Sequence, residues 1–107
     1  MTMQNLSVNR TVKKLGRDIK SARLRRRLPM ALVAERAGIS VRTLGSIEKG
    51  ETGVSIGNVT AVILAMGMGT PFADILDQKN DSFGLLLDEE RLPKRARLPK
   101  TEKTIYE

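Results

Sequence analysis

The spacing of apolar residues predicts a series of short helices. Between residues 11 and 27, apolar side chains recur every three or four positions, as on one face of an amphipathic helix; they are Val12, Leu15, Ile19 and Ala22. Leu28-Pro29 interrupts this helix, because a residue before proline is disfavoured in the helical conformation. Pro29 suits the start of a second helix, expected over about 30–37 and ended by Gly38.

A third helix is expected over 41–49. Ser40 is a preferred N-cap residue, and Gly50 stops the helix. Leu44 and Ile47 are one turn apart and are expected on its inner side. Gly45, in its interior, costs about 1 kcal/mol relative to Ala and is expected on the outer side.

Two more helices complete the pattern. Ser55 can cap a fourth helix over about 56–66, and residues 71–76 form a short fifth one. We therefore expect an all-α fold with one domain over 11–76.

The flanks differ from this domain in composition. Residues 1–10 are expected to be a lead-in, and residues 77–107 an extended, charged and partly disordered tail with two prolines. The apolar pentad "FGLLL" (83–87) is an exception within the tail, because a wholly solvated segment does not need it.

The composition excludes several classes of function. The chain has no Cys and no His, which removes disulfides, thiolate metal sites and most nucleophilic and general-base chemistry. We expect no catalytic residue, no cofactor, no metal and no enzymatic activity. The start has no secretory signal, and the most apolar run (59–68) is too short to span a bilayer, so a cytoplasmic protein without a membrane partner is expected.

The net charge of +7 is unevenly distributed. Residues 1–50 hold twelve Lys and Arg against three acids, residues 51–76 hold two acids and no base, and residues 77–107 hold seven of each. A basic N-terminal half favours a polyanionic partner, although a solvated basic face kept for solubility fits the charge equally well.

The second and third helices have the spacing of a helix-turn-helix. Ala34 provides the small residue needed where the two helices cross, and Gly38 provides the turn residue that tolerates a positive φ. Apolar residues stand at the positions that hold the third helix from beneath: Val33, Ile39, Leu44 and Ile47.

From about Leu15 to Leu76 the chain resembles the Cro/repressor-like (XRE-type) helix-turn-helix family. The resemblance lies in "VAERAGISVRTLGSIEKGE" (33–51) and "SIGNVTAVILAMGM" (55–68). It implies a compact five-helix, lambda-repressor-like domain, usually dimeric, that places its third helix in the major groove of double-stranded operator DNA. It also implies a transcriptional repressor of the bacterial cytoplasm, bound to the nucleoid when on DNA.

The resemblance assigns roles to individual residues. The base-facing positions would be Val41, Arg42, Gly45 and Ser46, and the phosphate-facing positions would be Ser40, Thr43, Lys49, Thr52, Gly53 and Ser55. The basic run Arg25, Arg26 and Arg27 is expected to add sequence-independent phosphate affinity. Met30 replaces the polar, phosphate-binding residue that is common in the family. Arg42 is the one long side chain among the base-facing positions, so we expect it to supply most base discrimination.

Glu48 has two interpretations. An acid in a DNA-facing helix can accept a hydrogen bond from cytosine, whereas the resemblance pairs Glu48 with Arg23 in a structural salt bridge. We favour the salt bridge, because an unpaired carboxylate beside phosphates repels them.

The fourth helix is more apolar than one buried face requires. The surplus residues are Ala61, Val62, Leu64, Ala65 and Met68, and they precede Phe72, Ile75 and Leu76. This surplus favours a homodimer interface, which would supply two half-site readers. Complete burial of the helix in a small core is the alternative.

The segment "GLLLDEERLPKRARLPK" (84–100) resembles the C-terminal segment of HipB-like antitoxins, which accompany HipA-like serine/threonine kinases. The resemblance implies an autorepressor of a toxin-antitoxin system that also binds a kinase toxin through 83–99, with Phe83, Leu85, Leu86, Leu87, Leu92 and Arg95 as docking residues. The alternative is a stand-alone or phage-type repressor without a toxin partner, whose tail keeps the protein soluble or contacts phosphates.

Overall fold

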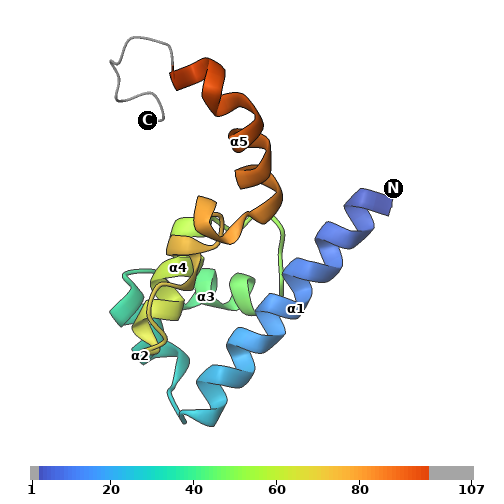
Figure 1. Ribbon diagram of the computed structural model, residues 1–107. Coiled ribbons are helices and arrows are strands. Elements are labelled where there is room, and N and C mark those ends of the chain that lie inside the picture. The colour runs from blue at the N-terminus through green and yellow to red at the C-terminus, as the bar shows by residue number, and fades with distance from the viewer. Residues whose placement is uncertain (1–2, 97–107) are drawn as a thin grey trace. The chain divides into compact units, whose positions relative to one another are not determined.

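The computed structural model describes the backbone of residues 3–96 and the side chains of residues 3–91 (Figure 1). Every regular element in this part of the chain is helical, which confirms the expected all-α fold. The chain divides after Thr70 into two compact units.

The N-terminal unit contains four α-helices: α1 (Met3–Arg25), α2 (Met30–Ala37), α3 (Val41–Glu48) and α4 (Ile56–Ala65). The C-terminal unit contains two short 3-10 helices, η1 (Pro71–Asp74) and η2 (Gln78–Asn80), followed by α5 (Ser82–Ala96). The bounds of α2, α3 and α4 agree with the sequence-based prediction to within one residue, because each is set by a local cap or turn residue.

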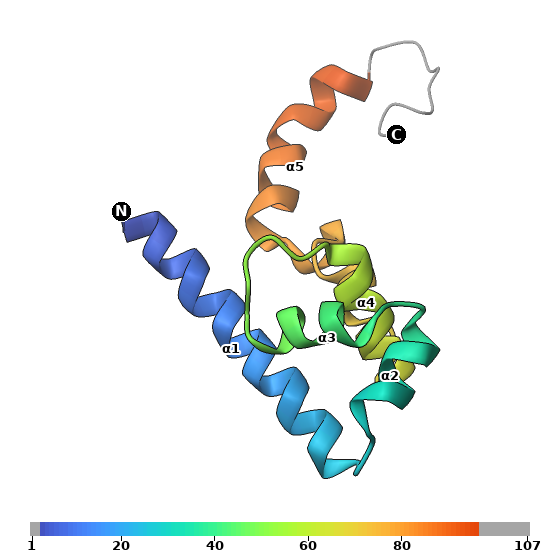
Figure 2. The same cartoon turned by 180° about the vertical axis from the view of Figure 1, so that it is seen from behind.

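The first helix begins at Met3, eight residues before the predicted start, so residues 3–10 form helix rather than a lead-in. Its buried residues begin only at Gly16, and they are Gly16, Ile19, Ala22 and Arg23. The N-terminal half of α1 therefore extends beyond the packed part of the unit, as Figures 1 and 2 show from opposite sides.

The core of the N-terminal unit is aliphatic. Its buried hydrophobic residues are Ile19, Ala22, Val33, Ala34, Leu44, Ile47, Val59, Val62, Ile63 and Met66. The helix α2 packs on α4, and α1 packs on α3. The three largest fully buried side chains, Val33, Leu44 and Val62, come from α2, α3 and α4, so this core joins the two helices of the helix-turn-helix to the helix that follows them.

Two glycines bring α1 into backbone contact with the end of α3. A Cβ on Gly16 would lie 2.5 Å from the carbonyl oxygen of Ile47, and a Cβ on Gly50 would lie 2.5 Å from the Cα of Lys13. Gly50 also has a φ of 76°, a left-handed conformation that favours glycine. No side chain fits at either position without separating α1 from the end of α3.

The end of α1 is closed by a residue other than glycine. Arg27 has a φ of 54°, and the N–H of Leu28 donates to the carbonyl of Arg23 at 3.2 Å. This left-handed residue with a hydrogen bond back into the last turn is the usual C-terminal stop of a helix. It turns the chain into the Leu28-Pro29 link that precedes α2.

The C-terminal unit differs from the extended tail expected after residue 76. The predicted helix over 71–76 is reduced to the 3-10 turn η1, whereas residues 82–96 form the helix α5. Asp81 caps α5, because its carboxylate accepts the N–H of Gly84 at 3.0 Å. Pro93, one of the two prolines of the tail that was expected to be extended, lies within α5. A proline inside a helix removes one backbone hydrogen bond and distorts the helix without always ending it.

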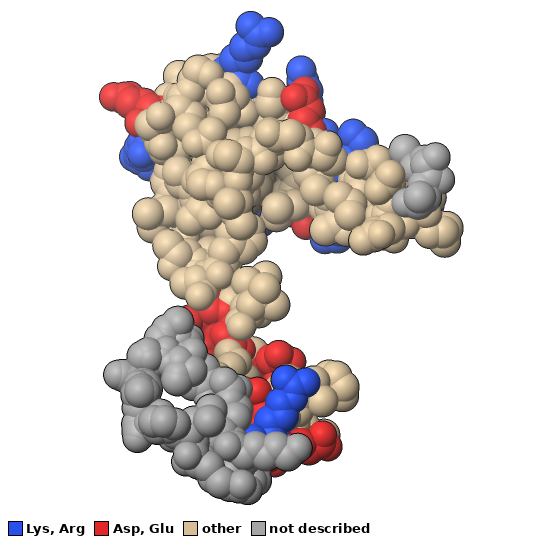
Figure 3. Space-filling model, turned by 90° about the horizontal axis from the view of Figure 1, so that it is seen from above, with Lys and Arg blue, Asp and Glu red and all other residues tan. Residues whose placement is uncertain are grey.

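The two units differ in charge. The sequence places twelve Lys and Arg against four acids in residues 1–70, and seven Lys and Arg against eight acids in residues 71–107. On the face shown in Figure 3, basic side chains project from the N-terminal unit at several points, and acidic side chains are visible on the described part of the C-terminal unit. The excess of positive charge therefore belongs to the unit that contains the helix-turn-helix.

Candidate nucleic-acid interface

The turn between α2 and α3 has the geometry that its residues predict. Gly38 has a φ of 74°, and the N–H of Ile39 donates to the carbonyl of Ala34 at 3.0 Å. A Cβ on Gly38 would meet nothing within 4 Å, so the glycine is required by its backbone conformation and not by lack of space. Ala34 is 2% exposed at the contact between the helices.

Ser40 starts α3 and is fully engaged there. Its hydroxyl oxygen accepts the N–H of Thr43 at 3.0 Å, and its O–H donates to the hydroxyl oxygen of Thr43 at 3.0 Å. A phosphate oxygen needs a donor, and the donor of Ser40 is already used. Thr43 accepts that hydrogen bond, so its own O–H remains able to donate to a ligand. Of the two hydroxyls, that of Thr43 is therefore the one suited to a phosphate.

The two sides of α3 are clearly different. Leu44 and Ile47 are 0% and 2% exposed and hold the helix against the core. Val41 and Arg42 are exposed, while Gly45 and Ser46 are half-buried. Of the four residues assigned to base edges, Val41 and Arg42 are therefore accessible to a ligand, whereas Gly45 and Ser46 are only partly accessible.

Met30 lies beside Gly45. A Cβ on Gly45 would meet the terminal methyl group of Met30 at 4.0 Å, which is an ordinary van der Waals distance. Met30 is half-buried at the first position of α2. Met30 is thus an apolar neighbour of α3.

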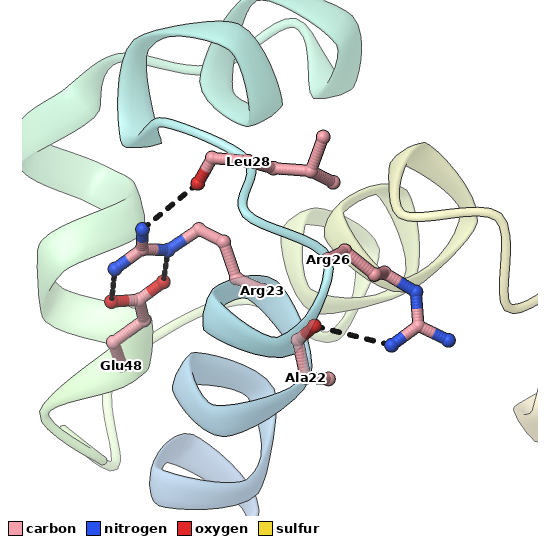
Figure 4. A network of polar contacts seen from close by, with 5 residues as sticks. All are labelled: Ala22, Arg23, Arg26, Leu28 and Glu48. Carbon is pink, nitrogen blue, oxygen red and sulfur yellow. Dashed lines mark hydrogen bonds and ion pairs between the residues drawn. The ribbon is translucent and has the colours of Figure 1, made fainter.

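An ion pair between Arg23 and Glu48 ties α1 to the last residue of α3 (Figure 4). Nε of Arg23 lies 2.6 Å from Oε2 of Glu48, and a second guanidinium nitrogen lies 3.0 Å from Oε1. The side chains are 8% and 5% exposed. This is the pair that the resemblance implied; it engages both carboxylate oxygens of Glu48, and the side chain is largely closed to solvent.

Arg23 also supports the link between α1 and α2. Its third guanidinium nitrogen donates to the carbonyl of Leu28 at 3.1 Å. The hydrogen bonds to Glu48 raise the pKa of Arg23 above its ordinary value, and burial opposes them. Arg23 therefore stays charged and holds the ends of α1 and α3 and the link before α2 together.

The residues assigned to phosphates come from several segments. Arg25, Arg26 and Arg27 are exposed at the end of α1, where Arg26 donates to the carbonyl of Ala22 at 3.1 Å and extends away from the buried ion pair (Figure 4). The assigned residues after α3 are also exposed; they are Lys49, Thr52, Gly53 and Ser55. Ser55 caps α4 by accepting the N–H of Asn58 at 3.0 Å.

The expected docking residues on α5 are exposed wherever their side chains are described. Phe83 is 70% exposed, Leu86 is 53% exposed, and Leu85 and Leu87 are 36% and 37% exposed. The side chains of Leu92 and Arg95 lie outside the described part of the structure, although the backbone of α5 runs through both. No helix of the described chain is long and apolar enough to cross a membrane.

Residues 19–72 match a protein family described as Helix-turn-helix, and this match covers just over half of the chain. The chain belongs to the helix-turn-helix family. The match supports the Cro/repressor-like (XRE-type) resemblance, and this helix-turn-helix protein is a DNA-binding transcription regulator. Comparisons with curated proteins and with solved structures gave no match, so nothing in them supports the resemblance of residues 84–100 to antitoxins.

Two features of the helix-turn-helix protein were not predicted from its sequence. Gly16 is buried against α3, although the pattern marked only its apolar neighbours; a glycine inside a strongly helical stretch was the available signal. The extension of α1 before residue 11 lacks strong apolar periodicity, because much of its surface contacts solvent. Residues 3–18 also lie outside the family match.

Proposed function

We propose that this transcription regulator binds its operator by inserting α3 into the major groove, and that it acts as a repressor. One observation carries the proposal: α3 is fixed on its inner side by Leu44, Ile47 and the Arg23–Glu48 ion pair, while Val41 and Arg42 remain exposed. A helix held rigidly from beneath can present its outer side chains to base edges with little loss of conformational entropy on binding.

The proposed phosphate contacts surround this helix. Thr43 lies in its first turn, Lys49 and the loop at Thr52 and Gly53 follow its end, and the basic run of 25–27 ends α1. These contacts would fix the orientation of the protein on the duplex, and the base-facing residues would then select the sequence. Ser40 and Ser55 contribute to this arrangement by capping α3 and α4.

A homodimer is part of the proposal. Large apolar side chains of α4 and of the residues after it are exposed: Ile56 at 71%, Leu64 at 55%, Met68 at 43%, Ile75 at 61% and Leu76 at 89%. Val62 is buried, and Ala61 and Ala65 are half-buried, so the core accounts for only part of the apolar surplus. The exposed remainder supports an interface between two copies, which would present two recognition helices to an inverted repeat.

Arg42→Ala should weaken operator binding by roughly 1–3 kcal/mol and relax the preference at one base pair of each half-site, because a guanidinium can bind guanine through two hydrogen bonds. Bound sites would first be selected from a pool of random DNA duplexes at two salt concentrations. The wild-type protein should select inverted half-sites, and the variant should select the same sites with one position degenerate.

Lys49→Ala is the matched control for Arg42→Ala, since it removes one positive charge from the end of the same helix. It should weaken binding to all sequences about equally. If Arg42→Ala also weakens all sequences equally, Arg42 contacts a phosphate and does not discriminate bases.

We further propose that the exposed apolar residues of α5 bind a protein partner, as in an antitoxin of a HipBA-like module. A stand-alone repressor is the alternative. The helix α5 presents Phe83, Leu86 and Leu87 to solvent. Its N-terminus is capped by Asp81, so none of these three apolar side chains is needed for the cap. An autorepressor that binds a HipA-like kinase through this helix would use them in the complex. A stand-alone or phage-type repressor would bind no such partner.

A neighbouring kinase-like reading frame, co-expressed with the regulator, would test the antitoxin proposal. The kinase should co-purify with the full chain, and a variant with Phe83, Leu86 and Leu87 replaced by Ser should lose it while retaining DNA binding. Replacing the three nearby acids Asp88, Glu89 and Glu90 by their amides is the control for a general change of the helix surface. Undiminished co-purification of the Ser variant would exclude docking through α5.

A further inference from the structure

A cavity of about 370 Å³ lies between α1 and the loop that follows the recognition helix. It is lined by Asn9, Lys13, Gly50, Glu51, Thr52 and Gly53. Figure 2 shows this loop running beside α1 from the end of α3. The two residues from α1 precede the family match, which begins at residue 19, so this cavity depends on the part of the first helix that lies before the match.

The position of Lys13 in this cavity is set by the backbone. The Cα of Lys13 is so close to Gly50 that a Cβ there would approach it to 2.5 Å, and Gly16 is in similar contact with the carbonyl of Ile47. Both glycines hold α1 against the last turn of α3. Lys13 is therefore fixed next to the end of the recognition helix, although its side chain is exposed.

The cavity offers several hydrogen-bond donors. Lys13 forms no ion pair with any described residue, in contrast to its neighbour Lys14, which is paired with Asp18 at 2.7 Å. The amide of Asn9 and the hydroxyl of Thr52 are further donors. The backbone N–H groups of Thr52 and Gly53 make no hydrogen bond with another backbone group in the described part of the chain.

A phosphodiester fits this set of donors, because its oxygens carry negative charge and only accept hydrogen bonds. Glu51 is the one acid in the lining, and its carboxylate would weaken the binding of any anion. The site would therefore contribute modestly on its own and would act together with contacts made elsewhere on the same duplex. This favours a phosphate of a DNA backbone over a free phosphate ion.

We propose that this cavity binds one phosphate of the DNA backbone, so that the part of α1 before the family match adds a contact beside the recognition helix. The proposal rests on the proposed binding of α3 in the major groove. Because Lys49 is the C-cap of α3 and the loop at Thr52 and Gly53 follows it, a duplex contacted by α3 would have a backbone strand near this end of the helix. Lys13 and Asn9 extend that contact to α1.

Lys13 also has a purely structural interpretation. The last carbonyls of α3 form the negative end of its dipole, and a nearby cation can stabilise the helix there. In that case the loss of Lys13 would lower the stability of the fold and leave the number of phosphate contacts unchanged. Measurements of stability and of salt dependence separate the two roles.

The test uses the full chain with a labelled operator duplex and a labelled duplex of random sequence, titrated at several NaCl concentrations. Lys13→Ala should reduce the slope of log affinity against log salt by about 0.9 on both duplexes, the value for one lost phosphate contact. Lys14→Ala is the matched control: it removes the same charge from the next residue, which is paired with Asp18 and does not line the cavity. It should leave the slope unchanged. Glu51→Gln should raise the affinity for both duplexes.

Equal slopes for the Lys13 and Lys14 variants, with a lower melting temperature for the Lys13 variant alone, would assign Lys13 to the helix end and overturn the phosphate site. A fall in affinity for Glu51→Gln would also contradict it, because the carboxylate would then assist binding. If the wild-type protein bound neither duplex, the proposed function itself would fail, and this result is distinct from failure of the cavity alone.

Discussion

Glu48→Ala is expected to lower the free energy of unfolding by about 3–5 kcal/mol, because it leaves the guanidinium of Arg23 buried without its counter-charge. The carbonyl of Leu28 would remain as an acceptor, but a neutral oxygen does not replace a carboxylate bound through two hydrogen bonds. A domain of this size is stable by only about 5–10 kcal/mol, so the variant should be close to unfolding. Urea denaturation followed by circular dichroism would measure the change.

The exposed pair of Lys14 and Asp18 provides the control for this substitution. Its side chains are 71% and 58% exposed, and an exposed pair one helical turn apart contributes about 0.3–0.5 kcal/mol. Asp18→Ala should therefore have almost no effect. If both variants lost the same small amount, the Arg23–Glu48 pair would contribute no more than a surface pair.

Replacement of both Arg23 and Glu48 tests whether the stability lost in Glu48→Ala comes from the unpaired buried charge of Arg23. Arg23→Met together with Glu48→Leu removes the buried charge as well as its partner, and such exchanges are often neutral or stabilising. The double variant should thus recover most of the stability that Glu48→Ala loses. Neither exchange should alter which base is preferred at any position, and a changed preference would mean that Glu48 contacts DNA bases directly.

The helix-turn-helix could be predicted from the sequence because its signals are local. Gly38 and Ser40 determine where α2 ends and α3 begins, through a left-handed backbone and a side-chain cap. Each acts within four residues, so it is visible in one short stretch. The inner side of α3 follows from the spacing of Leu44 and Ile47 alone.

The elements that the sequence did not predict depend on the distant parts of the chain or on weak local signals. The extension of α1 before residue 11 has no apolar face of the usual kind, since its described residues are exposed or at most half-buried. The helix α5 was expected to be an extended chain because Pro93 and a mixture of charges are typical of loops, whereas its start depends on the cap by Asp81. The cavity at Lys13 requires residues 9–13 and 50–53 to meet, and no local pattern indicates that.

The first helix therefore serves several sites at once. Arg23 holds the last residue of α3 through Glu48, Gly16 allows close approach to the last turn of α3, and Lys13 lies beside the loop that follows. These three positions are seven and three residues apart, so they lie near one another on the surface of α1. The position of α3 therefore depends on its contacts with α1 as well as on the turn after α2.

Gly16→Ala is expected to lower the free energy of unfolding by about 2 kcal/mol, although alanine is normally the better helix former. The new Cβ would lie 2.5 Å from the carbonyl oxygen of Ile47, 2.8 Å from the backbone nitrogen of Gly50 and 2.9 Å from the carbonyl oxygen of Glu48. All three atoms belong to the backbone, so no side-chain rotation relieves the contact and α1 must move away from α3. Overpacking of this kind costs roughly 1–3 kcal/mol or more, and the higher helix propensity of alanine returns only about 1 kcal/mol.

Gly45→Ala is the matched control, since it makes the same substitution inside a helix of the same unit. Its Cβ would meet only the terminal methyl of Met30 at 4.0 Å, so the gain in propensity should remain and the variant should be more stable by up to about 1 kcal/mol. Denaturation of both variants should thus give shifts of opposite sign. A stabilised Gly16→Ala variant would mean that α1 and α3 are not in backbone contact.

Gly45→Ala also tests whether the missing side chain of Gly45 lets DNA approach α3 closely. If this variant is stabilised and keeps full operator affinity, DNA does not approach α3 closely at Gly45. Reduced operator affinity in a stabilised variant would support the close approach.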